Sequence, residues 1–199
     1  MISAHPDDEV LGMGATIKKL SRTNKIWLCV VSEGTSSQYS DKKMIKVRSD
    51  ACKKSAKILG ISKIQFLDYP DMRLDSVPHL EINKQLEKII KKFKPSIVYS
   101  PPSHDLNKDH QKVFESALVI TRPFSSSVKK LLCYELPGPV REPFHPSVYE
   151  NIEKEFSHKI KAFKMYKTEV MKFPHPRSIK AIENLAMQRG VESSLKMAE

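Results

Sequence analysis

The expected fold follows from one stretch at the start of the chain, residues 1–14, which reads MISAHPDDEVLGMG. Pro6 cannot continue a strand ladder, so residues 2–4 are expected to end a strand and residues 5–8 to form the turn that leaves it. An aspartate of this turn can then cap a helix over about residues 10–21. The passage from a strand to a helix is a usual place for a functional site in α/β proteins.

One imidazole and two carboxylates crowd into this turn, at His5, Asp7 and Asp8. No packing requirement explains the group, and repulsion between the carboxylates would cost stability unless a cation or a basic group lies among them. The turn therefore predicts a metal site. The plainer interpretation is that Asp7 or Asp8 serves only as a helix cap.

The chain has 199 residues, of which 40% are hydrophobic and 29% are charged. These values are ordinary for one globular domain with a full core, so we expect residues 1–199 to form a single domain. No apolar run is long enough to span a membrane and no signal peptide precedes the first motif, so a cytoplasmic location is expected. Cys29, Cys52 and Cys133 lie far apart in apolar settings, which favours buried, reduced thiols.

The formal net charge is +11, from 34 basic and 23 acidic side chains. Such an excess can attract nucleic acid, anionic lipid or an anionic small substrate. The lysines often occur in pairs on predicted helices, such as Lys18-Lys19 and Lys91-Lys92, and this pattern is typical of a solvated surface. No nucleic-acid motif accompanies them, so we expect no specific nucleic-acid partner.

Strands and helices are expected to alternate along the chain. Short apolar runs predict further strands, at residues 25–31, 63–67, 95–100 and 131–136, with a short extra strand at 148–152. Apolar residues at helical spacing predict helices, at residues 43–60, 80–93, 110–120, 155–166 and 179–190. This order indicates an α/β fold: a Rossmann-like, doubly wound, mostly parallel sheet of about five to six strands, with helices on both faces.

Two polar loops are expected to meet in this fold. In doubly wound sheets the strand order reverses beside the first strand, so the loops after the first and fourth strands face each other. These loops hold residues 5–8 and residues 104–110, about a hundred positions apart in the sequence. The topology therefore supports a metal site independently of the crowded charges.

The two loops offer a ligand set of two nitrogens and one oxygen, from His5, Asp8 and His110. Three protein ligands leave one position open, which is typical of catalytic zinc sites. Water in that position becomes a nucleophile, and the metal can polarise a carbonyl. Asp7 would accept the proton of the water, and Asp109 could orient a ligand or a catalytic group through a hydrogen bond.

Plainer roles are open for several polar residues. His110 could simply begin a helix, and His104 could lie on an ordinary polar surface. Arg48, early on the predicted helix 43–60, is either an exposed arginine or a substrate clamp. If these plainer roles were all correct, several residues with no functional role would gather by chance where the two polar loops meet. This coincidence disfavours the plainer roles taken together.

Several stretches resemble one known family. They are AHPDDEVLG at residues 4–12, RSDACKKSAKILG at 48–60, DYPDMRLD at 68–75, HDLNKDH at 104–110 and HPRSIKAIENLAMQRG at 175–190. These stretches resemble the zinc-dependent N-acetylglucosaminyl de-N-acetylases of the phosphatidylinositol-glycan-L (PIG-L) and LmbE type. The resemblance implies a Rossmann-like fold, one Zn²⁺ on His5, Asp8 and His110, and Asp7 as the general base.

The resemblance also implies that Arg48 and Asp71 hold sugar hydroxyls. Many members carry a second histidine three residues before the downstream zinc ligand, where this chain has Asn107. The donor that stabilises the oxyanion would then be Asn107, or His104 reaching in from further back. Members usually carry more residues before the first motif and after the last one, so the chain is expected to lack residues at both ends.

The expected function is hydrolysis of the N-acetyl group of an N-acetylated amino sugar or glycoconjugate, with one Zn²⁺ per chain. The expected partner is this small-molecule substrate, and a homo-oligomer is open. A non-haem Fe(II) oxygenase can use the same ligand types, although oxygen chemistry does not need a base such as Asp7. A non-catalytic nucleotide- or polyanion-binding module could use Gly12 and Gly14 in a phosphate-binding turn, although the nearby carboxylates would repel phosphate.

Overall fold

Five strands and six α-helices make up the computed structural model, which describes residues 1–199. The strands are β1 (Ile2–Ser3), β2 (Trp27–Ser32), β3 (Lys63–Tyr69), β4 (Ile97–Ser100) and β5 (Lys130–Cys133). The helices are α1 (Asp8–Leu20), α2 (Lys43–Leu59), α3 (His79–Phe93), α4 (Lys108–Ile120), α5 (Phe156–Phe163) and α6 (Ile179–Glu192). Helices and strands alternate as far as β5, which confirms the α/β class.

The strands form two small sheets, ordered β1-β2-β3 and β4-β5, and every strand pair is parallel. The expectation of one continuous sheet of five to six strands is therefore wrong. The physical reason lies in β1, which contributes only two paired positions, Ile2 with Cys29 and Ser3 with Val30. A strand of two residues pairs with β2 on one side and forms no ladder with β4 on the other.

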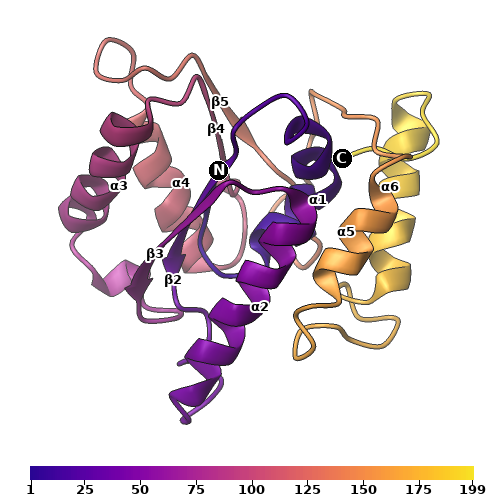
Figure 1. Cartoon of the computed structure of the whole chain (residues 1–199), viewed down its shortest axis with the longest axis horizontal. Helices are drawn as coiled ribbons and strands as arrows, with labels where there is room; N and C mark the ends of the chain where they lie inside the picture. Colours follow the sequence, from indigo (N-terminus) through magenta and orange to yellow (C-terminus); the bar gives the residue numbers. More distant parts are fainter.

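Helices cover both sides of the strands. Figure 1 shows α3 and α4 on one side, and α1, α2, α5 and α6 on the other. Strand β2 contributes buried side chains to the core on both sides of the sheet, because successive side chains of a strand point to opposite faces. Leu28 and Val30 belong to the core cluster that includes α1, α2 and α5, whereas Cys29 and Val31 belong to the cluster that includes α3 and α4. This explains the unbroken apolar run of β2.

Helix α1 is kinked and is completed by the carboxyl-terminal residue. Met13 has non-helical angles (φ −145°, ψ 34°). The amides of Ala15 and Thr16 donate instead to the side-chain carboxylate of Glu199, at 3.3 and 2.7 Å. Lys159 Nζ donates to the same carboxylate at 2.6 Å and to the Leu11 carbonyl at 2.8 Å. The end of the chain therefore closes against its first helix.

Two local expectations are corrected. The extra strand at residues 148–152 does not form, and only a single bridge joins Asn151 to Ala198. Cys29 and Cys52 are buried as expected, but Cys133 is exposed. Cys133 ends β5, which has a neighbouring strand on one side only. None of the helices is long and apolar enough to cross a membrane.

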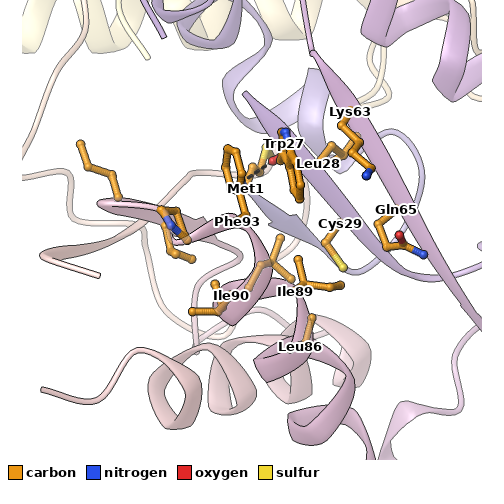
Figure 2. A pocket seen from close by; sticks show the side chains of 14 residues that line it. Met1, Trp27, Leu28, Cys29, Lys63, Gln65, Leu86, Ile89, Ile90 and Phe93 are labelled. Atoms are coloured by element: carbon orange, nitrogen blue, oxygen red, sulfur yellow. Dashed lines mark hydrogen bonds between the residues drawn. The ribbon is translucent and has the colours of Figure 1, made fainter. Parts of the chain in front are cut away.

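An apolar pocket lies at the amino ends of β1, β2 and β4 (Figure 2). The rings of Trp27 and Phe93 stack beside it with centroids 3.9 Å apart, and Lys63 Nζ lies 4.7 Å from the Trp27 ring. The polar turn after β1 lies at the opposite, carboxyl end of that strand. None of the expected site residues lines this pocket.

Candidate active site

The polar loops after β1 and β4 meet, as the topology predicts. His5 follows β1 and His110 lies in the first turn of α4. The Nδ1 atom of His5 is 3.2 Å from the Nε2 atom of His110, and both side chains are buried. Two segments separated by 105 residues therefore form one site.

His5, Asp8 and His110 form a compact donor set. One ligand atom of each residue lies within 4.8 Å of those of the other two, and all three residues are buried. Asp8 Oδ2 accepts a hydrogen bond from the His5 amide at 2.8 Å, while Asp8 Oδ1 lies 3.4 Å from His110 Nε2. Two imidazole nitrogens that face each other beside a carboxylate oxygen fit a cation such as Zn²⁺, which takes nitrogen and oxygen ligands.

Three further carboxylates contact the outer nitrogens of these two rings. Asp109 and Asp71 lie 3.1 and 3.2 Å from His5 Nε2, and Asp105 lies 2.7 Å from His110 Nδ1. Metal-ligating histidines typically use their second nitrogen in this way, which fixes the orientation of the ring. Asp109 is therefore placed to orient His5.

A second group that could hold a metal consists of His5, Asp71 and Asp109. Its carboxylates are already engaged in the protein. Asp109 accepts hydrogen bonds from the amides of Met72 and Leu74 at 2.8 and 2.9 Å. Asp71 accepts one from the Ser37 hydroxyl. The first group, in which Asp8 Oδ1 has no protein hydrogen bond, is the better metal site.

Neighbouring charges shift the pKa values of His5, His110 and Asp8. Burial lowers the pKa of His5, but Asp109 and Asp71 outweigh this effect and raise the pKa to about 10. Burial also lowers the pKa of His110, and Asp8 and Asp105 raise it to about 9. Burial raises the pKa of Asp8, but the effects of His110 and His5 are larger and opposite, so the net shift of this pKa is downward. The neighbouring carboxylates therefore favour positive charge on His5 and His110. A bound metal ion would supply that charge in place of the protons on the two imidazole rings.

Asp7 has an unusual backbone and an unusual side-chain environment. Its φ of 128° is rare for a residue other than glycine and costs about 1–3 kcal/mol. The amide of Asp7 donates to Glu9 Oε2 at 3.0 Å, and the Asp7 carbonyl accepts from the amides of Val10 and Leu11. The buried carboxylate of Asp7 has no hydrogen-bond partner on either oxygen. Asp7 occupies the N-cap position of α1, but its side chain does not cap the helix.

Burial raises the pKa of Asp7 to about 6, with a contribution from Asp8, while Arg177 and Arg48 act in the opposite direction. Arg177 Nη1 lies 3.4 Å and Arg48 Nη1 lies 3.8 Å from Asp7 Oδ2. Both arginines also pair with Glu169, which is buried. Asp7 is therefore held near two cations while its lone pairs stay free.

The expected sugar-binding residues are buried and have protein partners. Arg48 is 3% exposed, which excludes the exposed arginine considered from the sequence, and its Nη2 donates to Glu169. Asp71 is 5% exposed. Its amide donates to Glu33 Oε1 at 3.1 Å, and its carboxylate contacts Ser37 and His5. A sugar role for Arg48 and Asp71 stays a prediction.

The two residues expected at the oxyanion make other contacts in the structure. Asn107 is the N-cap of α4, and its side-chain oxygen accepts a hydrogen bond from the Asp109 amide at 2.8 Å. His104 lines a separate pocket beside Phe144, with ring centroids 5.7 Å apart. No hydrogen bond joins either side chain to the donor set, and an oxyanion role for Asn107 or His104 stays a prediction.

Three residues of the site were given no individual role from the sequence: Asp105, Glu169 and Arg177. Asp105 and Arg177 lie in stretches that resemble the known family, at residues 104–110 and 175–190, so a signal marked their neighbourhoods. Glu169 lies in no such stretch. Its role follows only from its contacts with two arginines.

A buried donor set of two imidazoles and a carboxylate, with a free carboxylate beside it, is a site suited to metal-assisted hydrolysis. Comparison with known proteins defines the class more closely. A model of the family described as "PIG-L: GlcNAc-PI de-N-acetylase" matches residues 1–121. The chain belongs to this family of deacetylases.

Individual relatives agree with this assignment. The "Uncharacterized deacetylase YaiS" of Escherichia coli (strain K12) is 32% identical over 176 residues, which cover 84% of this chain and 89% of the relative. The "Diacetylchitobiose deacetylase" of Thermococcus kodakarensis is 34% identical over 105 residues, covering 50% of this chain and 39% of the relative. The structure of N,N'-diacetylchitobiose deacetylase from Pyrococcus horikoshii superposes with a TM-score of 0.83 at 24% identity, covering 100% of this chain and 80% of that one. That last similarity concerns the fold.

Proposed function

We propose that the protein is a metal-dependent hydrolase that removes the N-acetyl group from an N-acetylated amino sugar or glycoconjugate. The observation that carries this proposal is Asp7, a buried carboxylate with two unpartnered oxygens directly beside the donor residue Asp8. A free carboxylate next to a metal site can act as a general base. Membership of the deacetylase family supports an amide as the bond that is broken.

The roles of the residues follow from their chemistry. His5, Asp8 and His110 would hold one Zn²⁺ per chain, and Asp109 would orient His5. When bound, the ion supplies Lewis acidity, which polarises the acetyl carbonyl and lowers the pKa of water. Asp7 accepts a proton from the attacking water and later donates it to the leaving nitrogen. A C–O bond forms, the C–N amide bond breaks, and the products are acetate and a free amine.

The substrate class rests on two supports. The Thermococcus kodakarensis relative is named for diacetylchitobiose, a short N-acetylated saccharide. The net charge of +11 favours substrates that carry negative charge. We therefore propose a short N-acetylated saccharide or an anionic glycoconjugate, with Arg48 and Asp71 near the sugar hydroxyls.

The first experiment measures the metal content of the purified protein, together with acetate release from a panel of N-acetylated sugars. We expect about one zinc per chain, with activity that is lost on chelation and restored by added metal. Asp8→Asn serves as the matched control, because it replaces a ligand carboxylate by a neutral amide and should lose metal and activity together. Folded, metal-loaded protein that releases no acetate from any sugar in the panel would contradict the proposal.

The non-catalytic alternative predicts different results. A polyanion-binding module would bind nucleotide or nucleic acid after chelation as well as before it. The hydrolase should show only weak, salt-sensitive binding to such ligands. Binding measured at two salt concentrations, with and without a chelator, separates the two functions.

A further inference from the structure

Arg177 joins the candidate base to a distant part of the chain. It immediately precedes Ser178, the N-cap of α6. Arg177 Nη1 is 2.5 Å from Glu169 Oε2 and 3.4 Å from Asp7 Oδ2. The carboxyl-terminal third of the chain thus contributes directly to the site built from the turn after β1.

Four charges make up this cluster: the carboxylates of Asp7 and Glu169 and the guanidinium groups of Arg48 and Arg177. Each arginine lies within 4.0 Å of both carboxylates. The two positive and two negative charges balance, which makes their joint burial tolerable. The loss of Glu169 would leave two cations with a single counter-charge, Asp7.

The two arginines differ in their access to solvent. The side chain of Arg48 is 4% exposed, whereas that of Arg177 is 32% exposed. Arg48 is therefore enclosed within the protein, whereas Arg177 contacts the buried carboxylate of Asp7 and is also partly exposed to solvent. Of the two, Arg177 is the more accessible to a ligand that enters from solvent.

Arg177 has donors to spare. Its side chain makes one hydrogen bond in the protein, from Nη1 to Glu169, so Nε and Nη2 remain free. A guanidinium group carries five N–H donors in a rigid, planar arrangement. Because Glu169 holds Nη1 and the group is planar, the positions of the other donors are restricted before any ligand binds. Such preorganisation lowers the entropic cost of binding and of reaching the transition state.

We propose that Arg177 contacts the substrate, with its free guanidinium donors bound to oxygen of the N-acetyl group beside Asp7, and that Glu169 is a positioning residue for Arg177. The inference rests on the proposed deacetylase function. The acetyl oxygen gains negative charge during hydrolysis, and the product acetate has two oxygens that match a planar fork of N–H donors. Arg177 thus recognises the group that every substrate of the reaction shares.

The test compares Arg177→Ala and Arg177→Lys with Arg122→Ala, all in the metal-loaded enzyme. Arg122 is a control because it is exposed at the end of α4 and bonds only the Val119 carbonyl. We expect Arg177→Ala to lower kcat/KM by about 10- to 100-fold, as for the loss of a charge-assisted hydrogen bond. The kcat/KM of Arg177→Lys should lie between those of Arg177→Ala and the wild type, because lysine keeps the positive charge but lacks the planar set of N–H donors. Arg122→Ala should match the wild type.

Chemical rescue separates contact from a structural role. Added guanidinium ion should restore part of the turnover of Arg177→Ala and should leave Arg122→Ala unchanged. Circular dichroism and metal content check that each variant is folded and loaded. If Arg177→Ala does not fold, Arg177→Lys decides, and a folded Arg177→Lys with wild-type kcat and KM would overturn the proposal. Wild-type protein without activity would instead count against the deacetylase function itself.

The role of Glu169 is tested by a double-mutant cycle of Glu169→Gln and Arg177→Ala. If Glu169 acts through Arg177, the double variant should lose little more kcat/KM than Arg177→Ala alone. Losses that multiply would show that Glu169 acts independently and would overturn its assignment as a positioning residue.

Discussion

Asp7 combines two costs at one residue. Its backbone holds a φ of 128°, and its buried carboxylate has no hydrogen-bond donor on either oxygen. Each feature destabilises the folded protein, and such costs cluster at functional sites, where the surrounding structure enforces them. Glu9 contributes to that enforcement, because its side chain binds the Asp7 amide and also accepts hydrogen bonds from Ser55 and Tyr166.

Asp7→Asn tests the role of the base. The substitution keeps the size of the side chain and removes its ability to accept a proton at neutral pH. We expect the variant to retain its metal and to lose turnover by about 10²–10⁴-fold, the usual contribution of a general base. Metal analysis and acetate release on the same sample measure both properties. Full activity of metal-loaded Asp7→Asn would refute the assigned role.

Glu33 organises the loop that leads to Asp71. Its carboxylate accepts hydrogen bonds from the amides of Thr35, Ser36 and Asp71, at 2.8 to 3.2 Å. Burial raises the pKa of Glu33, but hydrogen bonds from Ser36, Thr35 and Asp71 outweigh it, so the pKa is lowered from 4.5. The stability from these bonds is therefore present above the unfolded pKa and is lost as the pH falls through the folded pKa.

Glu33→Gln should lower the free energy of unfolding by about 1–3 kcal/mol at neutral pH, because the charge-assisted bonds are weakened. The difference from the wild type should narrow in acid, where the wild-type carboxylate also becomes neutral. Urea denaturation at a series of pH values from about 7 to about 3 measures this difference. A difference that stays constant with pH would contradict the assignment.

The sequence predicted one part of the site much better than the other. His5, Asp7 and Asp8 are adjacent, and the topology pointed to His110, so local pattern and chain order were enough. Glu169 and Arg177 could not be predicted in this way. An ion pair between distant segments leaves no periodic signal, and it depends on packing that brings the two segments together.

At the scale of elements, the start of α4 positions both a ligand and its support. Asn107 caps the helix through the Asp109 amide, Asp109 contacts His5, and His110 belongs to the donor set. The loop at Met72–Leu74 is tied to the same turn through Asp109. Loss of the Asn107 cap should therefore also displace the candidate metal ligands His5 and His110.

Asn107→Ala should lower the free energy of unfolding by about 0.5–2 kcal/mol, as for the loss of an N-cap. It should also weaken metal binding, because the first turn of α4 carries Asp109 and His110. Asn107→Asp keeps a capping oxygen and should retain both stability and turnover. Chemical denaturation and metal titration measure the effects.

Ser178→Ala is the matched control, since Ser178 caps α6 through the Ala181 amide at 3.1 Å. It should lose similar stability and keep its metal affinity. Folded, metal-loaded Asn107→Asp without turnover would show that the Asn107 amide acts in the reaction, as the resemblance first suggested.

The elements were largely predictable because apolar periodicity determines which residues a helix or a strand can bury. The exact residues at which the strands begin and end were less predictable. The strand expected at residues 131–136 begins one residue earlier and ends at Cys133, and the expected strand at 148–152 is a single bridge. A strand ends where its hydrogen bonds to the neighbouring strand end, and the residues of that neighbour lie elsewhere in the sequence.

At the scale of the whole molecule, the number of strands was predictable but their joining was not. The sheet divides between β1 and β4 because β1 spans only Ile2–Ser3. Side-chain packing nevertheless continues across the division, since Ile2 and Val98 belong to one buried cluster. Sequence patterns report burial, and they do not report which backbone ladders form.

Glu199 should contribute strongly to global stability. Its carboxylate pairs with buried Lys159 and accepts the amides of Ala15 and Thr16. We expect Glu199→Ala to lower the free energy of unfolding by about 3–5 kcal/mol, because a buried cation loses its counter-charge. Denaturant unfolding monitored by circular dichroism measures the loss.

The exposed pair between Lys196 and Glu153, at 2.7 Å, supplies the control. Glu153→Ala should change stability by no more than about 1 kcal/mol. Equal losses in Glu199→Ala and Glu153→Ala would mean that the buried pair contributes no more to stability than the exposed pair, which would contradict the prediction.

The closure of α1 by Glu199 also bears on how the protein is made. Glu199 accepts hydrogen bonds from the amides of Ala15 and Thr16 but lies 184 and 183 residues beyond them, so α1 is synthesised long before this partner. During synthesis those amides can bind only water, and Asp7 at the start of the same helix has neither Glu169 nor Arg177 beside it. The site should therefore complete its folding only after Glu199 has been synthesised, and not as soon as the turn at residues 5–8 has been made.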